Sequence, residues 1–249
     1  VVPMTAEAAG YGTKLQWWDF SDSSKIGSFV TPGDRTGSIS QADGFGGKDA
    51  SDKVALVTGA QDGHNTSLGG GGGAYTSSVI TVETDVYVGT GNKFMIYSGT
   101  AGGGDNGKRY GIKLEGSALQ SVIPWTYTDI EGQTGIDMNV WHKIAVEWNG
   151  EDGNVYLYFD GELVHTFTGA LSVGSTGRSI DIRIQGRAYI DNYRVYTTEY
   201  DTTGEVMPAI DNNSYSFLAG AMTVAEAKAM VMANQNADTA VARVYKGAV

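Results

Sequence analysis

Apolar and polar side chains alternate with a period of two along most of the chain, which is the spacing of half-buried β-strands. Ile144, Val146 and Trp148 fall on one face of one such segment, and the residues over 155–159 and 180–184 alternate in the same way. Further strands are predicted over these ranges: Lys14–Phe20, Lys53–Thr58, Val79–Val88, Lys93–Ser98, Lys108–Glu115 and Tyr189–Tyr196.

Turn signals separate these segments at intervals of roughly ten residues, as in all-β sandwiches and barrels. Asp160-Gly161 stands between two alternating segments, and Asp-Gly favours the type I′ turn of a hairpin because both central residues need positive φ. We therefore predict two packed antiparallel sheets, with Trp141–Trp148 and Asn154–Phe167 forming a hairpin. The glycine run Gly69–Gly73 precedes another predicted strand rather than a helix, so it is interpreted as a loop and not as a phosphate-binding motif.

The pattern changes near residue 205, where a linker precedes a segment predicted to form a strand, a helix and a strand. Thr223 is the expected N-cap of the helix, and Glu226 completes a capping box. A fragment of about 35 residues is too short to bury a core of its own. We therefore divide the chain into a β-sandwich over residues 1–204 and a linker with a partial β-α-β module over residues 205–249.

Composition narrows the choice of partners. The 249 residues include 17 Lys+Arg and 28 Asp+Glu, giving a formal net charge of −11, which argues against nucleic acid and anionic membrane surfaces as partners. No window approaches the ~20 consecutive apolar residues of a membrane span. The chain has no cysteine, which excludes disulfides and thiolate chemistry and favours a protein exported from a bacterium.

Four segments together resemble the laminin-G-like domains, which belong to the concanavalin A-like jelly rolls. The segments match the first strand, an early strand, the Trp-His hairpin and the final strand of that family, and they are Trp17–Phe20, Val79–Val88, Trp141–Val164 and Tyr189–Tyr196. The resemblance spans about residues 12–200 and implies an antiparallel two-sheet jelly-roll sandwich. It does not imply one activity, because this fold hosts lectins, adhesins, hydrolases and lyases.

A second, looser resemblance concerns the end of the chain. Ala219–Gly247 resembles the small β-α-β modules that follow domains in large secreted proteins of Gram-positive bacteria. This resemblance implies that the chain is an excerpt from a multimodular protein that is secreted or displayed on the cell surface. Neighbouring modules of that longer chain, or other copies of the same chain, are then expected partners.

Carboxylate spacing bears on catalysis. Jelly-roll glycoside hydrolases carry a Glu-x-Asp-x-x-Glu strand, which places its carboxylates on one face. Glu83 and Asp85 supply the first two positions, but no second Glu follows, so we expect a solvated strand face or a polar ligand contact and no catalytic residue. Glu147 and Asp181 could still complete a pair in space. A lyase also stays open, with a base and cationic groups drawn from Arg109, Tyr110, Lys113 and His165.

Sugar binding requires aromatic faces beside planar polar groups. Trp125 and Tyr127 stand two residues apart in a polar segment that we interpret as a loop, so their rings face one side if the backbone is extended. We expect a ligand platform here, and loop aromatics that cap the core are the alternative. Three further residues are expected to line the same face: Tyr97, Arg109 and Asp85. The strand tryptophans are expected in the core: Trp17, Trp18, Trp141 and Trp148.

The resemblance further implies a structural calcium ion held by the Asp of the final strand, which is Asp191 here. Hard cations prefer carboxylate and carbonyl oxygens, so Asp19 or the Asp43–Asp52 loop could complete the site. By simple alternation Arg194 projects to the opposite face from Asp191, which would leave a buried carboxylate without a partner. The alternative is that Asp191 anchors a loop as a hydrogen-bond acceptor.

Three functions remain at this point. The leading hypothesis is a non-catalytic carbohydrate-binding or adhesive module of a secreted or cell-surface bacterial protein, with a polysaccharide or other glycan as its partner. The second is a polysaccharide-degrading enzyme of the same fold, either a glycoside hydrolase or a lyase. The third is a structural subunit of a surface or filament assembly.

Overall fold

The computed structural model describes residues 14–23, 26, 38–59, 66–68, 75–99, 109–123, 126–176 and 179–200. All of them belong to one compact unit, residues 9–204. The predicted β-α-β module after residue 205 and the predicted ligand residue Trp125 lie outside the described residues. No helix in the described part of the chain has the length and apolar character needed to cross a membrane.

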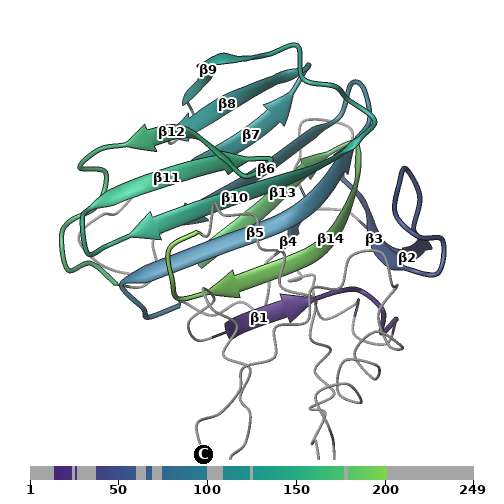
Figure 1. Cartoon of the computed structure of the whole chain (residues 1–249), viewed down its shortest axis with the longest axis horizontal. Helices are drawn as coiled ribbons and strands as arrows, with labels where there is room; N and C mark the ends of the chain where they lie inside the picture. The colour runs from purple at the N-terminus through teal and green to yellow at the C-terminus, as the bar shows by residue number, and fades with distance from the viewer. Residues whose placement is uncertain are drawn as a thin grey trace, which may run out of the picture. The chain divides into compact units, whose positions relative to one another are not determined.

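The strands form two antiparallel sheets that make a jelly-roll sandwich (Figure 1). Sheet A has the order β12-β11-β10-β5-β14-β3-β2, and β1 also pairs with β14. Its strands are β1 (Lys14–Trp18), β2 (Ser38–Asp43), β3 (Lys53–Thr58), β5 (Val79–Val88), β10 (Trp141–Asn149), β11 (Asn154–Phe159), β12 (Glu162–Phe167) and β14 (Arg187–Tyr196). Sheet B has the order β4-β13-β6-β7-β8-β9. Its strands are β4 (Thr66–Leu68), β6 (Lys93–Gly99), β7 (Gly111–Glu115), β8 (Ala118–Ile123), β9 (Thr126–Thr134) and β13 (Ser179–Gln185).

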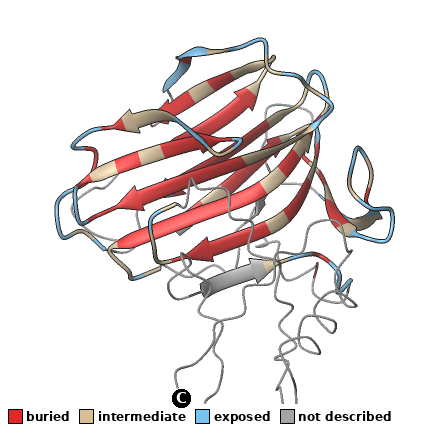
Figure 2. Ribbon diagram, in the orientation of Figure 1, coloured by how far each residue is buried: buried red, intermediate tan, exposed pale blue. Residues whose placement is uncertain are grey.

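The core lies between the sheets and is filled by alternate residues of each strand. Ile144, Val146 and Trp148 of β10 are all buried in it, which confirms the predicted strand face. Figure 2 shows that the central strands of sheet A are buried along most of their length, whereas the loops at their ends are exposed. The predicted hairpin is also confirmed, because β10 pairs with β11. At its next turn, into β12, Asp160 and Gly161 have φ values of 48° and 89°.

Two sequence-based assignments are wrong, each for a local reason. The segment interpreted as a polar loop around Tyr127 is strand β9, an edge strand that pairs only with β8 and therefore lacks an apolar alternation. Trp141 is not in the core, because it is out of phase with the buried Ile144 and lies on the outer face of sheet A, where its ring packs against Phe45. Trp18 is half-buried and packs against the core.

A β-bulge in β14 reverses the expected direction of Arg194. The register shifts between Asp191, which pairs with Asp85, and Arg194, which pairs with Glu83. Asn192 has a φ of 48°, the left-handed conformation that Asn tolerates better than most residues. Because of the extra residue, Asp191 and Arg194 lie on the same outer face of sheet A, and not on opposite faces as simple alternation predicts.

Candidate functional site

Cross-strand pairing brings side chains of five strands into two neighbouring rows on the outer face of sheet B, which we call the sheet B platform. The first row is Asp181, Tyr97, Gly111, Val122 and Tyr127. The second row is Arg183, Met95, Lys113, Gln120 and Asp129. The apolar members Met95, Tyr97 and Val122 form a cluster separate from the core, because the sheet itself stands between them and the core.

Tyr97 is on β6, the second of the five platform strands, and two cationic groups lie near its ring. The guanidinium carbon of Arg183 lies 4.9 Å from the centre of its ring, and that of Arg109 lies 5.6 Å away. Gly111, its cross-strand neighbour, allows the close approach of β7, since a Cβ there would lie 2.0 Å from the carbonyl oxygen of Ile96. Burial, and then the Asp181 carboxylate, raise the pKa of Tyr97. Its buried hydroxyl interacts with that carboxylate but makes no well-aligned hydrogen bond with a described residue.

The other end of the platform is more exposed and mixes an aromatic ring with polar groups. Lys113 Nζ lies 3.9 Å from the centre of the Tyr127 ring, which is 40% exposed, and it also forms an ion pair with Glu115. Gln120 Nε2 donates to Asp129 Oδ1 at 2.8 Å. Because an ionised carboxylate only accepts, this bond defines the amide orientation. The buried Gln120 Oε1 is then an acceptor without a donor in the described part of the chain.

The structure brings some of the predicted ligand residues together and separates others. Tyr97, Arg109 and Tyr127 all contribute to the sheet B platform. Asp85 is on β5 of sheet A, so it does not line the face that carries Tyr97. Gln120 and Arg183 were not predicted, and Lys113 was expected only as a cationic group of the lyase alternative. Only the pairing of distant strands shows that the three share one face with Tyr97.

Asp85 belongs to an ion-pair cluster on the outer face of sheet A. Its cross-strand partner is Asp191, which is 1% exposed, and the Lys48 ammonium lies between the two carboxylates. Lys48 Nζ is 2.9 Å from Asp85 Oδ2 and 2.6 Å from Asp191 Oδ2. Lys143 Nζ lies 3.1 Å from Asp85 Oδ1, and Asn192 Nδ2 donates to Asp85 Oδ2 at 2.9 Å. Both carboxylates are therefore neutralised from within the chain.

The same contacts shift the pKa values of this cluster. Burial disfavours the charged form of Asp85, but Lys143 and Lys48 outweigh it and hold the pKa of Asp85 at about 2. Burial dominates for Asp191 and raises its pKa to about 6, although Lys48 opposes the shift. Burial also disfavours the charged Lys48, but the two carboxylates raise its pKa above the ordinary value.

The described residues do not fit the calcium ion that the family resemblance implies. The oxygens of Asp191 and Asp85 that would face such an ion already accept hydrogen bonds from Lys48. Asp19 is exposed, and its carboxylate accepts hydrogen bonds from the backbone and hydroxyl of Ser21. In the described part of the chain, no group of three or more Asp, Glu or His side chains is placed to hold a metal ion.

The other carboxylates on the outer face of sheet A are also buried and bonded. Glu83 is 3% exposed, and accepts hydrogen bonds from Arg194 Nη1 at 2.8 Å and from the Tyr196 hydroxyl at 3.1 Å. The expected solvated strand face is therefore wrong for Glu83. Glu147 is 2% exposed, and its Oε2 accepts from the backbone nitrogen of Tyr200 at 2.9 Å. Burial raises the pKa of Glu147. Asp181 lies on the outer face of the other sheet, so Glu147 and Asp181 do not form a pair.

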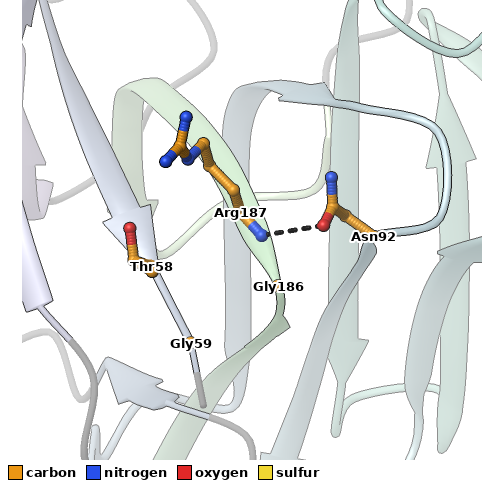
Figure 3. Close-up of a pocket in the computed structure, with 5 residues that line it drawn as sticks. All are labelled: Thr58, Gly59, Asn92, Gly186 and Arg187. Atoms are coloured by element: carbon orange, nitrogen blue, oxygen red, sulfur yellow. Dashed lines mark hydrogen bonds between the residues drawn. The ribbon is translucent and has the colours of Figure 1, made fainter. Parts of the chain in front are cut away.

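A pocket of about 320 Å³ lies where the two sheets meet at one end of the sandwich (Figure 3). Thr58, Gly59, Asn92, Gly186 and Arg187 line it. Asn92 Oδ1 accepts a hydrogen bond from the backbone nitrogen of Arg187 at 3.0 Å, and Gly59 N donates to Gly186 O at 2.7 Å. These bonds join the ends of β3, β6 and β14, and none of the five described residues that line the pocket carries an aromatic ring or a carboxylate. We therefore interpret the pocket as a structural seam.

No protein-family model matches the sequence, and no curated protein matches it. The chain is similar to a structure from work on endo-acting O-glycanases that prominent members of the human gut microbiota express to initiate mucin breakdown. That match has a TM-score of 0.51 and 12% identity, and covers 75% of this chain and 100% of the other. A Bacillus subtilis protein of unknown function with a galectin-like fold matches with a TM-score of 0.50 and 10% identity, covering 77% of this chain and 99% of the other. At these identities the similarities show the fold alone, a two-sheet β-sandwich.

Proposed function

We propose that this chain is a non-catalytic carbohydrate-binding or adhesive module that binds a glycan on the sheet B platform. The observation that carries the proposal is the combination of two aromatic rings, Tyr97 and Tyr127, with buried polar atoms that make no well-aligned hydrogen bond with a described residue. Those atoms are Tyr97 Oη and Gln120 Oε1. Both belong to side chains that the strand pairing places on the same face.

The chemistry of a sugar ring suits this arrangement. The apolar face of a pyranose stacks on an exposed aromatic ring such as Tyr127. Each sugar hydroxyl both donates and accepts, so it suits the Tyr97 hydroxyl and the Gln120 carbonyl oxygen. Tyr97 is 3% exposed, so the proposal requires the side chains that cover these atoms to move when the glycan binds. A buried polar group without a partner costs about 1–3 kcal/mol, which a ligand that supplies the missing bond would recover. Lys113 and Arg183 add donors along the second row.

The positions of the platform carboxylates support binding rather than hydrolysis. Asp181 on β13 and Asp129 on β9 are separated by four strand spacings, roughly 19 Å. Glycosidases hold their two carboxylates about 5–9.5 Å apart. Glu115 lies between them but is paired with both Lys93 and Lys113. Asp181 and Asp129 are therefore too far apart to act together as the acid and base of a glycosidase, and the Glu115 carboxylate is bound by two lysines.

The cellular setting is part of the same proposal. The absence of cysteine in the whole sequence and the resemblance to laminin-G-like domains support a secreted or cell-surface bacterial protein. The fold similarity to a protein from work on mucin breakdown agrees with an extracellular glycan as partner. We further propose that residues 205–249 begin or form part of a neighbouring module, so that the glycan-binding domain acts within a longer chain.

A glycan array probed with the labelled full-length chain tests the proposal, followed by titration calorimetry on the strongest ligand. Tyr127→Ala should weaken binding about 2- to 10-fold, because the stacking ring is lost. The matched control is Leu163→Ala on β12 of sheet A, which truncates a side chain that is 52% exposed and should leave affinity unchanged. Equal affinity for Tyr127→Ala and the unmutated chain, or no bound glycan, would contradict the proposal. Reducing-sugar and 235-nm absorbance assays on the same ligand test for hydrolase and lyase activity.

A further inference from the structure

The cluster of Asp85, Asp191 and Lys48 has features that the proposed function does not use. The two carboxylates face each other directly across β5 and β14, and like charges in such positions repel. Neither β5 nor β14 supplies the cation that bridges them. It comes from Lys48 in the loop over residues 43–52. Lys48 and Asp191 are 143 positions apart in the sequence. Lys48 therefore attaches the loop to sheet A, and its positive charge offsets the repulsion between the two facing carboxylates.

The surroundings of the Lys48 ammonium distinguish it from a metal site. Its Nζ lies 4.7 Å from the centre of the Trp141 ring, so one side of the position is an aromatic face. Ammonium groups bind favourably to aromatic faces, whereas calcium requires six to eight oxygen ligands. The other groups at the position are the two carboxylates and the Asn192 amide, whose Nδ2 is a donor and not a ligand for a cation.

The loop that carries Lys48 is itself held by aromatic contacts. The Phe45 ring packs edge-on against Tyr87 and Tyr189, with ring centres 4.8 and 4.6 Å apart. Trp141 Nε1 donates to the carbonyl oxygen of Phe45 at 2.7 Å. Trp141 therefore both binds the loop backbone and forms the wall beside the ammonium. This arrangement presents Lys48 to the carboxylates in one position.

We propose that Asp85, Asp191 and Trp141 form a binding site for an alkylammonium group, which Lys48 fills from within the chain in place of a metal ion. The ligand class follows from the two carboxylates and the aromatic wall. In this arrangement the 43–52 loop is held on sheet A by Lys48, without a calcium ion. Removal of the Lys48 side chain leaves a site that a small alkylammonium ion can enter.

Chemical rescue of Lys48→Ala tests this site by thermal unfolding of the full-length chain. The substitution should lower Tm by roughly 6 °C or more, because the buried Asp191 carboxylate loses its cation and the half-buried Asp85 keeps only Lys143. n-Propylammonium, which replaces the missing part of the side chain, should recover part of that loss. Calcium chloride and sodium chloride at matched ionic strength should recover less. The matched control is Lys53→Ala on the same segment, which removes an exposed pair with Asp43 and should cost little and show no rescue.

The unmutated chain provides a second arm that does not depend on a variant folding. Its Tm should be the same in millimolar calcium chloride and in EDTA. A higher Tm in calcium, or a better rescue of Lys48→Ala by calcium than by n-propylammonium, would overturn the proposal in favour of a metal site. A loss in Lys48→Ala no larger than in Lys53→Ala would also overturn it. If Lys48→Ala does not fold, Lys48→Arg retains a cation and should keep a Tm close to that of the unmutated chain, and a large loss there would contradict the charge-based role.

Discussion

The outer faces of the two sheets both bury polar side chains, but they differ in whether those side chains are bonded. On sheet A the buried carboxylates Glu83, Asp191 and Glu147 each accept hydrogen bonds from named groups of the same domain. On sheet B, Tyr97 Oη and Gln120 Oε1 make no well-aligned hydrogen bond with a described residue. Buried polar groups in folded proteins normally form hydrogen bonds, so the bonded carboxylates of sheet A are explained by the stability of the fold. The outer face of sheet B retains hydrogen-bonding capacity, which the proposed glycan would use.

The largest expected effect is the loss of the buried ion pair on sheet A. Arg194→Met leaves the Glu83 carboxylate buried without its guanidinium, and the free energy of unfolding should fall by about 3–5 kcal/mol in urea titrations. Arg183→Met on sheet B should cost less, because Arg183 Nη2 lies 3.7 Å from the half-exposed Asp181. Addition of Glu83→Gln to Arg194→Met should restore part of the loss. A larger loss for Arg183→Met than for Arg194→Met would reverse the contrast between the faces.

The next effect is a pH dependence that originates on sheet A. Because the pKa of Asp191 is raised to about 6 in the folded state, its contribution to stability is present below pH 3.8 and is lost as pH rises through 6. The stability should therefore fall with increasing pH in this window, by at most about 1.4 kcal/mol per pH unit for one proton. Asp85, whose pKa is lowered to about 2, has the opposite sign and loses its contribution as pH falls from 3.8.

Asp191→Asn separates this contribution from others. Urea titrations between pH 4 and 7 should show that the free energy of unfolding falls less steeply with increasing pH in the variant than in the unmutated chain. Burial also raises the pKa of Glu147, which adds a slope of the same sign that remains in the variant. If the free energy of unfolding depends on pH equally steeply in the two proteins, the pH dependence does not arise from Asp191.

The smallest effect compares one hydroxyl on each face. Tyr196→Phe removes the hydrogen bond to Glu83 and should lower the free energy of unfolding by about 1–3 kcal/mol. Tyr97→Phe removes a hydroxyl that makes no well-aligned hydrogen bond with a described residue, so stability should change little, while affinity for the array-selected glycan falls about 3- to 10-fold. Titration calorimetry measures the glycan affinity of both variants, and urea titration measures their free energy of unfolding. A Tyr97→Phe variant that loses stability but keeps affinity would assign Tyr97 a structural role.

Local pattern was sufficient for most strands because a half-buried strand has its period of two in the sequence. Val79–Val88, Lys53–Thr58 and the turn at Asp160-Gly161 needed no long-range information. The polar edge strand Thr126–Thr134 could not be predicted in this way, since an edge strand is held by backbone pairing on one side and needs no apolar face.

The candidate site depended on tertiary structure to a greater degree. A period of two defines which residues share a face of one strand, but the assignment of that strand to a sheet depends on pairing with distant segments. Asp85 and Tyr97 were therefore predicted on one face and lie on different sheets. One extra residue at Asn192 changed the direction of Arg194. The partner of Asp191 came from Lys48, because charge neutralisation in a folded chain depends on proximity in space and not on distance along the sequence.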